Sequence, residues 1–140
     1  MASGVEYQVV TTAPVEEIVA LYQAGGWWRE SRDNRNRIEA MIRGSFCFMT
    51  ARLPGGSIIG MGRVISDGAS DAYIQDVVVL PSYRRQGIGR ELIQRLTQHC
   101  LKHKIGWIGL VAEPGTAGFY KQLGYRILEG YQPMLFEEGE

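Results

Sequence analysis

The sequence predicts an α+β domain in which a mixed, mostly antiparallel sheet is flanked by helices. Two observations support this fold class. Between Phe46 and Leu80, β-prone runs alternate with turns rich in Gly, Pro, Asp and Ser, as in strands joined by hairpins. On both sides of that block, apolar residues recur at helical spacing. Since 140 residues is the length of one ordinary domain, we expect a single domain over residues 1–140.

The N-terminal part predicts one strand and two helices. Val5 to Val10 is a short β-prone run. Pro14, followed by two glutamates, marks a helix start, and the pair Gly25-Gly26 ends that helix. A second helix is expected from Asp33 to Arg43, with its apolar residues turned inward and its arginines facing water.

The middle of the chain predicts the core of the sheet. Strands are expected at Phe46 to Leu53 and Ile58 to Ile65, separated by a Pro-Gly-Gly-Ser turn, and at Ala72 to Leu80. The last of these ends in four consecutive apolar residues, which is typical of a strand covered on both faces. We therefore expect Ala72 to Leu80 to be the centre of the sheet.

The C-terminal part alternates helices and strands. Apolar residues from Ile88 to Cys100 recur at helical spacing. The remaining elements are expected as a strand at Trp107 to Val111, a short helix at Ala117 to Leu123, and strands at Tyr125 to Leu128 and Met134 to Phe136.

Composition narrows the classes of function. Fifteen basic and fifteen acidic residues give a formal net charge of zero, which argues against nucleic acid or an anionic membrane as the partner. Cys47 and Cys100 have no metal-ligand spacing, and His99 and His103 lie four apart without further ligands, so no metal site is expected. With neither a signal peptide nor a long apolar run in the sequence, we expect a cytoplasmic protein.

One loop has the residues of a phosphate site. Arg84-Arg85-Gln86-Gly87-Ile88-Gly89 separates the expected central strand from its helix, and Arg90 follows. Glycines allow a ligand close to the backbone, and free amides at a helix start attract phosphate. The spacing differs from GxGxxG, and there is no Gly-Lys-Ser/Thr, so the ligand should be a pyrophosphate of another kind.

Two motifs together resemble the GNAT superfamily of N-acetyltransferases. Arg84-x-x-Gly87-x-Gly89 resembles its acetyl-CoA signature, and the run from Phe119 to Tyr125 resembles its second motif, FYxxxGF/Y. The resemblance implies a sheet that splays after the central strand, with acetyl-CoA as cosubstrate. It also implies pyrophosphate binding by the amides of Arg85 to Arg90, pantetheine pairing by the backbone of Val77 to Val79, and a general-acid role for Tyr120. Many members carry Asn where this chain has Thr116.

Asp76 interrupts the apolar central strand, where an unpaired carboxylate costs several kcal/mol. We expect either a structural partner such as Arg63 or an active-site role. Ile74 to Val79 resembles the strand of amino-sugar-phosphate acetyltransferases, so Gln75 and Asp76 are candidates to touch the acceptor, and Tyr73 shares a strand face with Gln75. Neighbouring strand residues point to opposite faces, so a bulge is needed for Gln75 and Asp76 to line one wall.

These observations predict an enzyme that transfers the acetyl group of acetyl-CoA directly to a primary amine, with Tyr120 and Asp76 as the catalytic candidates. Glu113 or a water chain is an alternative base. A non-catalytic acyl-CoA binder is the competing hypothesis. The acceptor is left open between a small molecule and a protein. Trp27 and Trp28 are candidates for an acceptor-pocket wall, a homodimer contact or ordinary partial burial.

Overall fold

The computed structural model describes residues 4–138, which form two compact units divided after Leu110. We describe the N-terminal unit, residues 4–110, and the C-terminal unit, residues 111–138, in turn. In the described part of the chain, no helix has the length and apolar character needed to cross a membrane.

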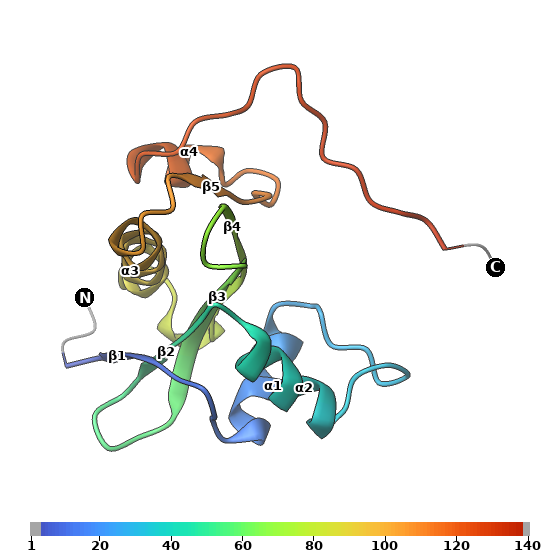
Figure 1. Ribbon diagram of the computed structural model, residues 1–140. Helices are drawn as coiled ribbons and strands as arrows, with labels where there is room; N and C mark the ends of the chain where they lie inside the picture. The colour runs from blue at the N-terminus through green and yellow to red at the C-terminus, as the bar shows by residue number, and fades with distance from the viewer. Residues whose placement is uncertain (1–3, 139–140) are drawn as a thin grey trace. The chain divides into compact units, whose positions relative to one another are not determined.

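The N-terminal unit is built on a five-stranded sheet in the order β1-β2-β3-β4-β5 (Figure 1). The first four strands pair antiparallel and β5 pairs parallel to β4, which confirms the predicted mixed, mostly antiparallel sheet. The strands are β1 (Glu6–Val9), β2 (Cys47–Arg52), β3 (Ile58–Ser66), β4 (Asp71–Val79) and β5 (Trp107–Gly109).

Helices cover both faces of this sheet. Glycines 60 and 62 of β3 lie against α3, since a Cβ at Gly62 would be 2.8 Å from Leu96 Cδ1. Met61, between them, belongs instead to the core formed with α1 and α2. Successive residues of a strand face opposite sides, so α3 packs on one face and the α1–α2 pair on the other, as Figure 1 shows. The helices are α1 (Val15–Ala24), α2 (Arg35–Gly44) and α3 (Ile88–Lys102), with a 3₁₀ turn η1 at Pro81–Tyr83.

Local sequence explains where the first two helices begin and end. Pro14 occupies the N-cap position of α1, and Gly25 is its C-cap. Asn34 caps α2, because its side-chain oxygen accepts a hydrogen bond of 3.0 Å from the amide of Arg37. The second helix therefore begins two residues later than predicted. Residues 25–34 between the two caps form the α1–α2 segment.

A bulge interrupts β4 at its centre. Met61 pairs with Val78 and Arg63 pairs with Gln75, so the single residue Gly62 lies opposite two residues of β4, Asp76 and Val77. Asp76 has a φ of 57°, in the left-handed region that non-glycine residues rarely adopt. The regular alternation of side chains is broken at this position.

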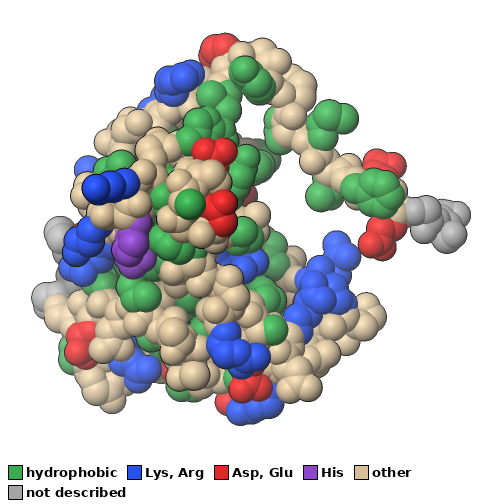
Figure 2. All heavy atoms as spheres, viewed as in Figure 1, with side chains coloured by type: hydrophobic (Ala, Val, Ile, Leu, Met, Phe, Trp, Pro, Cys, Tyr) green, Lys and Arg blue, Asp and Glu red, His purple; other side chains and the backbone are tan. Residues whose placement is uncertain are grey.

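The C-terminal unit contains one short helix, α4 (Ala117–Gln122). The strands predicted at Tyr125 to Leu128 and Met134 to Phe136 are wrong, because neither segment pairs with a strand among the described residues. β-prone residues form a strand only when a neighbouring strand accepts their hydrogen bonds. Met134, Leu135 and Phe136 instead expose 85–91% of their surface, and Figure 2 shows hydrophobic side chains along this segment.

Candidate functional site

The glycine loop, residues Arg84–Gly89, joins the end of β4 to α3 through η1. The Nε of Arg84 donates a 2.9 Å hydrogen bond to the carbonyl oxygen of Val79, so this guanidinium holds the loop against the strand end. Arg85 and Gly87 both have positive φ, 64° and 82°. Left-handed residues in a short loop turn backbone amides toward one side, as in anion-binding nests.

Backbone amides at the start of α3 are available to a ligand. The first bond of the helix runs from the amide of Glu91 to the carbonyl of Gly87, so the amides of Ile88, Gly89 and Arg90 have no acceptor within the helix. A Cβ at Gly89 would come no closer than 3.9 Å to its nearest neighbour, whereas Gly87 is required by its backbone angle. The predicted phosphate-binding residues Arg85, Gln86, Gly87, Ile88, Gly89 and Arg90 therefore form one continuous turn.

The bulged residue Asp76 has two partners from other elements. Its Oδ2 accepts hydrogen bonds from Arg63 Nε at 2.7 Å and from Tyr22 Oη at 2.8 Å. Arg63 and Asp76 expose only 14% and 19% of their side chains. Arg63 is the structural partner that the sequence predicts. Burial, reinforced by the Asp76 carboxylate, raises the pKa of Tyr22, so its hydroxyl remains a donor to Asp76.

The bulge places two predicted site residues on one face of the sheet. Gln75 pairs directly with Arg63, and residues opposite one another in a ladder share a face. Asp76 contacts that same Arg63 and Tyr22 of α1. Gln75, Asp76 and the exposed Tyr73, which pairs with Ile65, thus lie toward the α1–α2 side. The objection that neighbouring strand residues cannot line one wall is removed.

A pocket of about 240 Å³ opens beside Asp76. We call it the α1–α2 pocket. Its lining combines indole rings and aliphatic side chains with three guanidinium groups and two carboxylates. The lining residues are Tyr22, Trp27, Trp28, Arg32, Asp33, Arg37, Ile38, Met41, Arg63 and Asp76. Trp27 and Trp28 line this pocket and are also half-buried, so an acceptor-pocket wall and ordinary partial burial both agree with the structure, and the homodimer contact stays a prediction.

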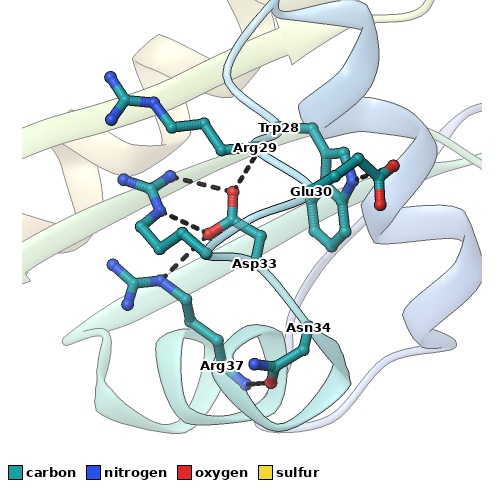
Figure 3. Close-up of polar contacts among 7 residues, drawn as sticks. Trp28, Arg29, Glu30, Asp33, Asn34 and Arg37 are labelled. Carbon is teal, nitrogen blue, oxygen red and sulfur yellow. Dashed lines mark hydrogen bonds and ion pairs between the residues drawn. The ribbon is translucent and has the colours of Figure 1, made fainter.

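Asp33 organises the charged side of this pocket (Figure 3). Its Oδ1 lies 2.7 Å from Arg32 Nε and 3.2 Å from Arg37 Nε, and its Oδ2 accepts from Arg32 Nη2 at 3.0 Å and from the Arg29 amide at 2.8 Å. These contacts, with the Arg32 hydrogen bonds foremost, lower the pKa of Asp33 to about 2. Asp33 is 6% exposed, while the two arginines remain about half exposed, at 44% and 48%.

The arginines of α2 are exposed, as the sequence predicted. What the sequence did not predict is that Arg37 also lines the pocket, together with Arg32. The available signal was their density: Arg29, Arg32, Arg35 and Arg37 fall within nine residues of a chain with zero formal net charge. Tyr22 was also missed, because it reads as one more apolar residue on the buried face of α1.

Pairing between β4 and β5 is short. It covers only three pairs, from Asp71 with Trp107 to Tyr73 with Gly109, and β4 continues to Val79 without a β5 partner. β3, not β4, is the middle strand, so the expectation that Ala72 to Leu80 is the centre of the sheet is wrong, while the predicted splay stays a prediction. The ring of Tyr73 lies 5.3 Å from that of Trp107 at the last point of pairing. The backbone of Val77 to Val79, which the family resemblance assigns to pantetheine, belongs to the part of β4 that has a β3 neighbour but no β5 partner.

Tyr120 lies in α4 of the C-terminal unit. Its ring lies 5.1 Å from Phe119 and 6.1 Å from Tyr125. Burial, with the charge of Glu113 and the neighbouring Tyr125, raises its pKa, so the hydroxyl is protonated near neutral pH. Thr116, which replaces the family's common Asn, donates from Oγ1 to the carbonyl of Glu113 at 2.6 Å. Its side chain therefore shapes the turn before α4.

Comparison with known proteins decides the family. The profile of the Acetyltransferase (GNAT) family matches residues 13–125, which includes the glycine loop, the β4 bulge and α4. The chain belongs to the GNAT acetyltransferase family. A GNAT acetyltransferase from Streptococcus pneumoniae has the same fold, with a TM-score of 0.78 and 29% identity over 97% of this chain and 99% of that one.

Curated GNAT relatives match over about half of this chain. The histone acetyltransferase TAP1 of Glycine max is 44% identical over 68 residues, 49% of this chain and 29% of the relative. Serotonin N-acetyltransferase 2, chloroplastic, of Oryza sativa subsp. japonica is 36% identical over 78 residues, 56% of this chain and 39% of the relative. The matched stretches thus span well under half of these relatives. One name denotes a protein acceptor and the other a small-molecule amine.

Proposed function

We propose that this GNAT protein is an N-acetyltransferase that transfers the acetyl group of acetyl-CoA directly to a primary amine held in the α1–α2 pocket. One observation carries the proposal: a single strand, β4, ends in the glycine loop and carries at its bulge the carboxylate that lines the pocket. A thioester laid along the end of β4 that has no β5 partner would present its carbonyl at the bulge.

The cosubstrate would be held mainly by the backbone. Amides of residues 85–90 would bind the pyrophosphate at the start of α3, where the helix dipole favours negative charge. The backbone of Val77 to Val79, which has no β5 partner, would hydrogen-bond the pantetheine arm as an added strand does. No metal ion has a role in this reaction scheme.

The proposed reaction is a direct transfer. The neutral amine attacks the thioester carbonyl, forming a C–N bond and a tetrahedral oxyanion, which an amide at the bulge, that of Val77, would stabilise. Collapse breaks the C–S bond and sends its electron pair to sulfur. By the family resemblance, Tyr120 would give its proton to the thiolate, and the proton released by the amine nitrogen would return to Tyr120 through solvent. The products are the acetylated amine and coenzyme A.

Asp76 is assigned to positioning the amine. Its Oδ2 already accepts hydrogen bonds from Arg63 Nε and Tyr22 Oη, so this oxygen is occupied by partners from other elements. The other oxygen can accept a hydrogen bond from the attacking nitrogen at the pocket wall. The proton then leaves through water, one of the alternatives that the sequence left open. Tyr73 and Gln75, on the same face, are candidates to contact the acceptor.

The test is thiol release from acetyl-CoA across a panel of amines, with the product identified by mass spectrometry. Tyr120→Phe should lower kcat by at least about 10²-fold, the effect of a lost general acid, with acetyl-CoA affinity unchanged. Tyr131→Phe is the matched control, since Tyr131 is 75% exposed in the same unit. Tight acetyl-CoA binding without acetylation of any amine or peptide would identify a non-catalytic acyl-CoA binder instead.

A further inference from the structure

The charges around the α1–α2 pocket do not balance. Three arginines and two aspartates line it, a difference of one positive charge. Arg63 and Asp76 form a one-to-one pair at the β-sheet wall, whereas Arg32 and Arg37 share the single carboxylate of Asp33. The excess positive charge therefore lies on the helix side of the pocket. Basic side chains gather over this part of the surface in Figure 2.

The two arginines retain donors that Asp33 does not use. A guanidinium has five N–H groups in a planar fork. The described contacts of Arg37 with Asp33 involve only its Nε, and those of Arg32 involve Nε and one terminal nitrogen. Asp33 receives hydrogen bonds or ion pairs from four nitrogens and is nearly buried, so it is not a binding group for a substrate cation. Asp33 instead holds two guanidinium groups in place for an anion.

The rest of the lining is apolar and aromatic. The indoles of Trp27 and Trp28 and the side chains of Ile38 and Met41 complete the wall between the arginine pair and Asp76. The Trp28 ring is fixed by a 2.9 Å hydrogen bond from Nε1 to Glu30. A volume of about 240 Å³ corresponds to roughly eight water molecules at about 30 Å³ each, which is enough for a small acceptor.

We propose that the acceptor is a small amine that also carries an acidic group, with its nitrogen at Asp76 and its carboxylate or phosphate at Arg32 and Arg37. This inference rests on the proposed function and specifies its substrate class. Arginine forks bind carboxylate and phosphate in the same bidentate manner, so the two acids share one site. The apolar wall accommodates the carbon segment between the two ends.

An uncharged or purely cationic aromatic amine fits the same walls less well. Indole rings can bind an ammonium through their faces, which makes such an amine the principal competitor. Two half-exposed guanidinium groups would repel its positive charge, and their remaining donors would lose water without gaining a partner. The competitor therefore predicts that removing an arginine improves turnover, whereas the proposal predicts the reverse.

The experiment compares amines that differ only in their acid. Acetylation is measured for ω-amino acids of three to six carbons, their methyl esters, the matching alkylamines and the matching ω-aminoalkyl phosphates. Wild type should prefer an acid over its ester by at least about tenfold in kcat/KM, the effect of roughly 1.4 kcal/mol. Carboxylate and phosphate series, run side by side, identify which acid the pocket selects.

Two matched variants test the arginine pair. Arg37→Gln should reduce the preference for acids to near unity, because it removes a pocket guanidinium that makes a single contact with Asp33. Arg35 lies on the same helix as Arg37, and Arg35→Gln removes the same charge and one ion pair, that with Glu16. Because Arg35 does not line the pocket, the preference for acids should persist in this variant. Equal preference in the two variants overturns the proposal.

Binding is measured separately from catalysis, so that the two proposals can fail independently. In a Trp107→Phe background the remaining indoles are those of the pocket, and their fluorescence should respond to the acid at lower concentration than to its ester. One outcome is that the acid binds, that Arg37→Gln weakens this binding, and that no acetylation occurs. This outcome would support the acid site and contradict the transferase assignment. Acetylation of esters as fast as acids would defeat the acid site alone. Neither binding nor acetylation would defeat both.

Discussion

The glycine loop after β4 and the α1–α2 pocket beside it are built in different ways. In the loop the groups that can contact a ligand are backbone amides. The side chain of Arg84 instead donates a hydrogen bond to the carbonyl of Val79 at the end of β4. In the pocket they are side chains from α1, the α1–α2 segment, α2, β3 and β4. A backbone site depends on conformation and tolerates change in most side chains. A side-chain site depends on every ion pair that positions its members.

The largest effect should come from a glycine of the loop. Gly87→Glu forces a side chain into a φ of 82° and adds an acid where phosphate is expected, so acetyl-CoA affinity should fall by at least about 10²-fold, or roughly 2.7 kcal/mol. Calorimetric titration measures it. Gly130→Glu is the control, since Gly130 also has a φ of 82° and open space around it. Equal affinity in the two variants would remove the phosphate site from this loop.

Asp76→Asn should disturb the α1–α2 pocket while leaving the glycine loop intact. The variant leaves the partly buried Arg63 without its carboxylate, which should cost about 1–3 kcal/mol, less than the roughly 3–5 kcal/mol of a fully buried pair. The melting temperature and the kcat/KM for the amine should both fall, with acetyl-CoA affinity unchanged. Asp71→Asn, an exposed aspartate on the same strand, is the control. An Asp76→Asn protein with wild-type stability and activity would contradict both roles.

The difference between the two regions also explains what the sequence could predict. The order of elements up to α4, the mixed sheet and the loop were predicted, because periodicity, turn residues and glycine spacing are local signals. The pocket was not, since Tyr22, Arg37 and Asp76 come together only after the sheet and helices pack. The strands expected after Tyr125 were wrong because strand formation depends on a partner that composition does not reveal.

A smaller effect should follow from Tyr22→Phe. The change removes one hydroxyl that donates to Asp76 at 2.8 Å and keeps the ring in the core. A hydrogen bond to a charged group contributes about 1.5–3 kcal/mol, but Arg63 still holds the carboxylate, so the loss of stability should lie at the low end. Chemical denaturation and amine kinetics should both show the change. Tyr7→Phe, on the far strand beside Arg95, should show neither.

The smallest effect should be a local change at low pH that is confined to the α1–α2 pocket. Asp33 has a pKa of about 2 against an ordinary value of 3.8, so its contribution to the order of the arginine pair is complete above pH 3.8 and is lost as the pH falls through about 2. Trp28 lies beside this cluster (Figure 3), and its fluorescence should report the change. Glu30 accepts a hydrogen bond from the same indole, so the measurement belongs in a Glu30→Gln, Trp107→Phe background. Adding Asp33→Asn should abolish the transition, because the amide has no proton to gain. If the transition persists, Asp33 is not its source, and far-UV circular dichroism in the same range shows whether it is global unfolding, since unfolding removes the helices of both faces.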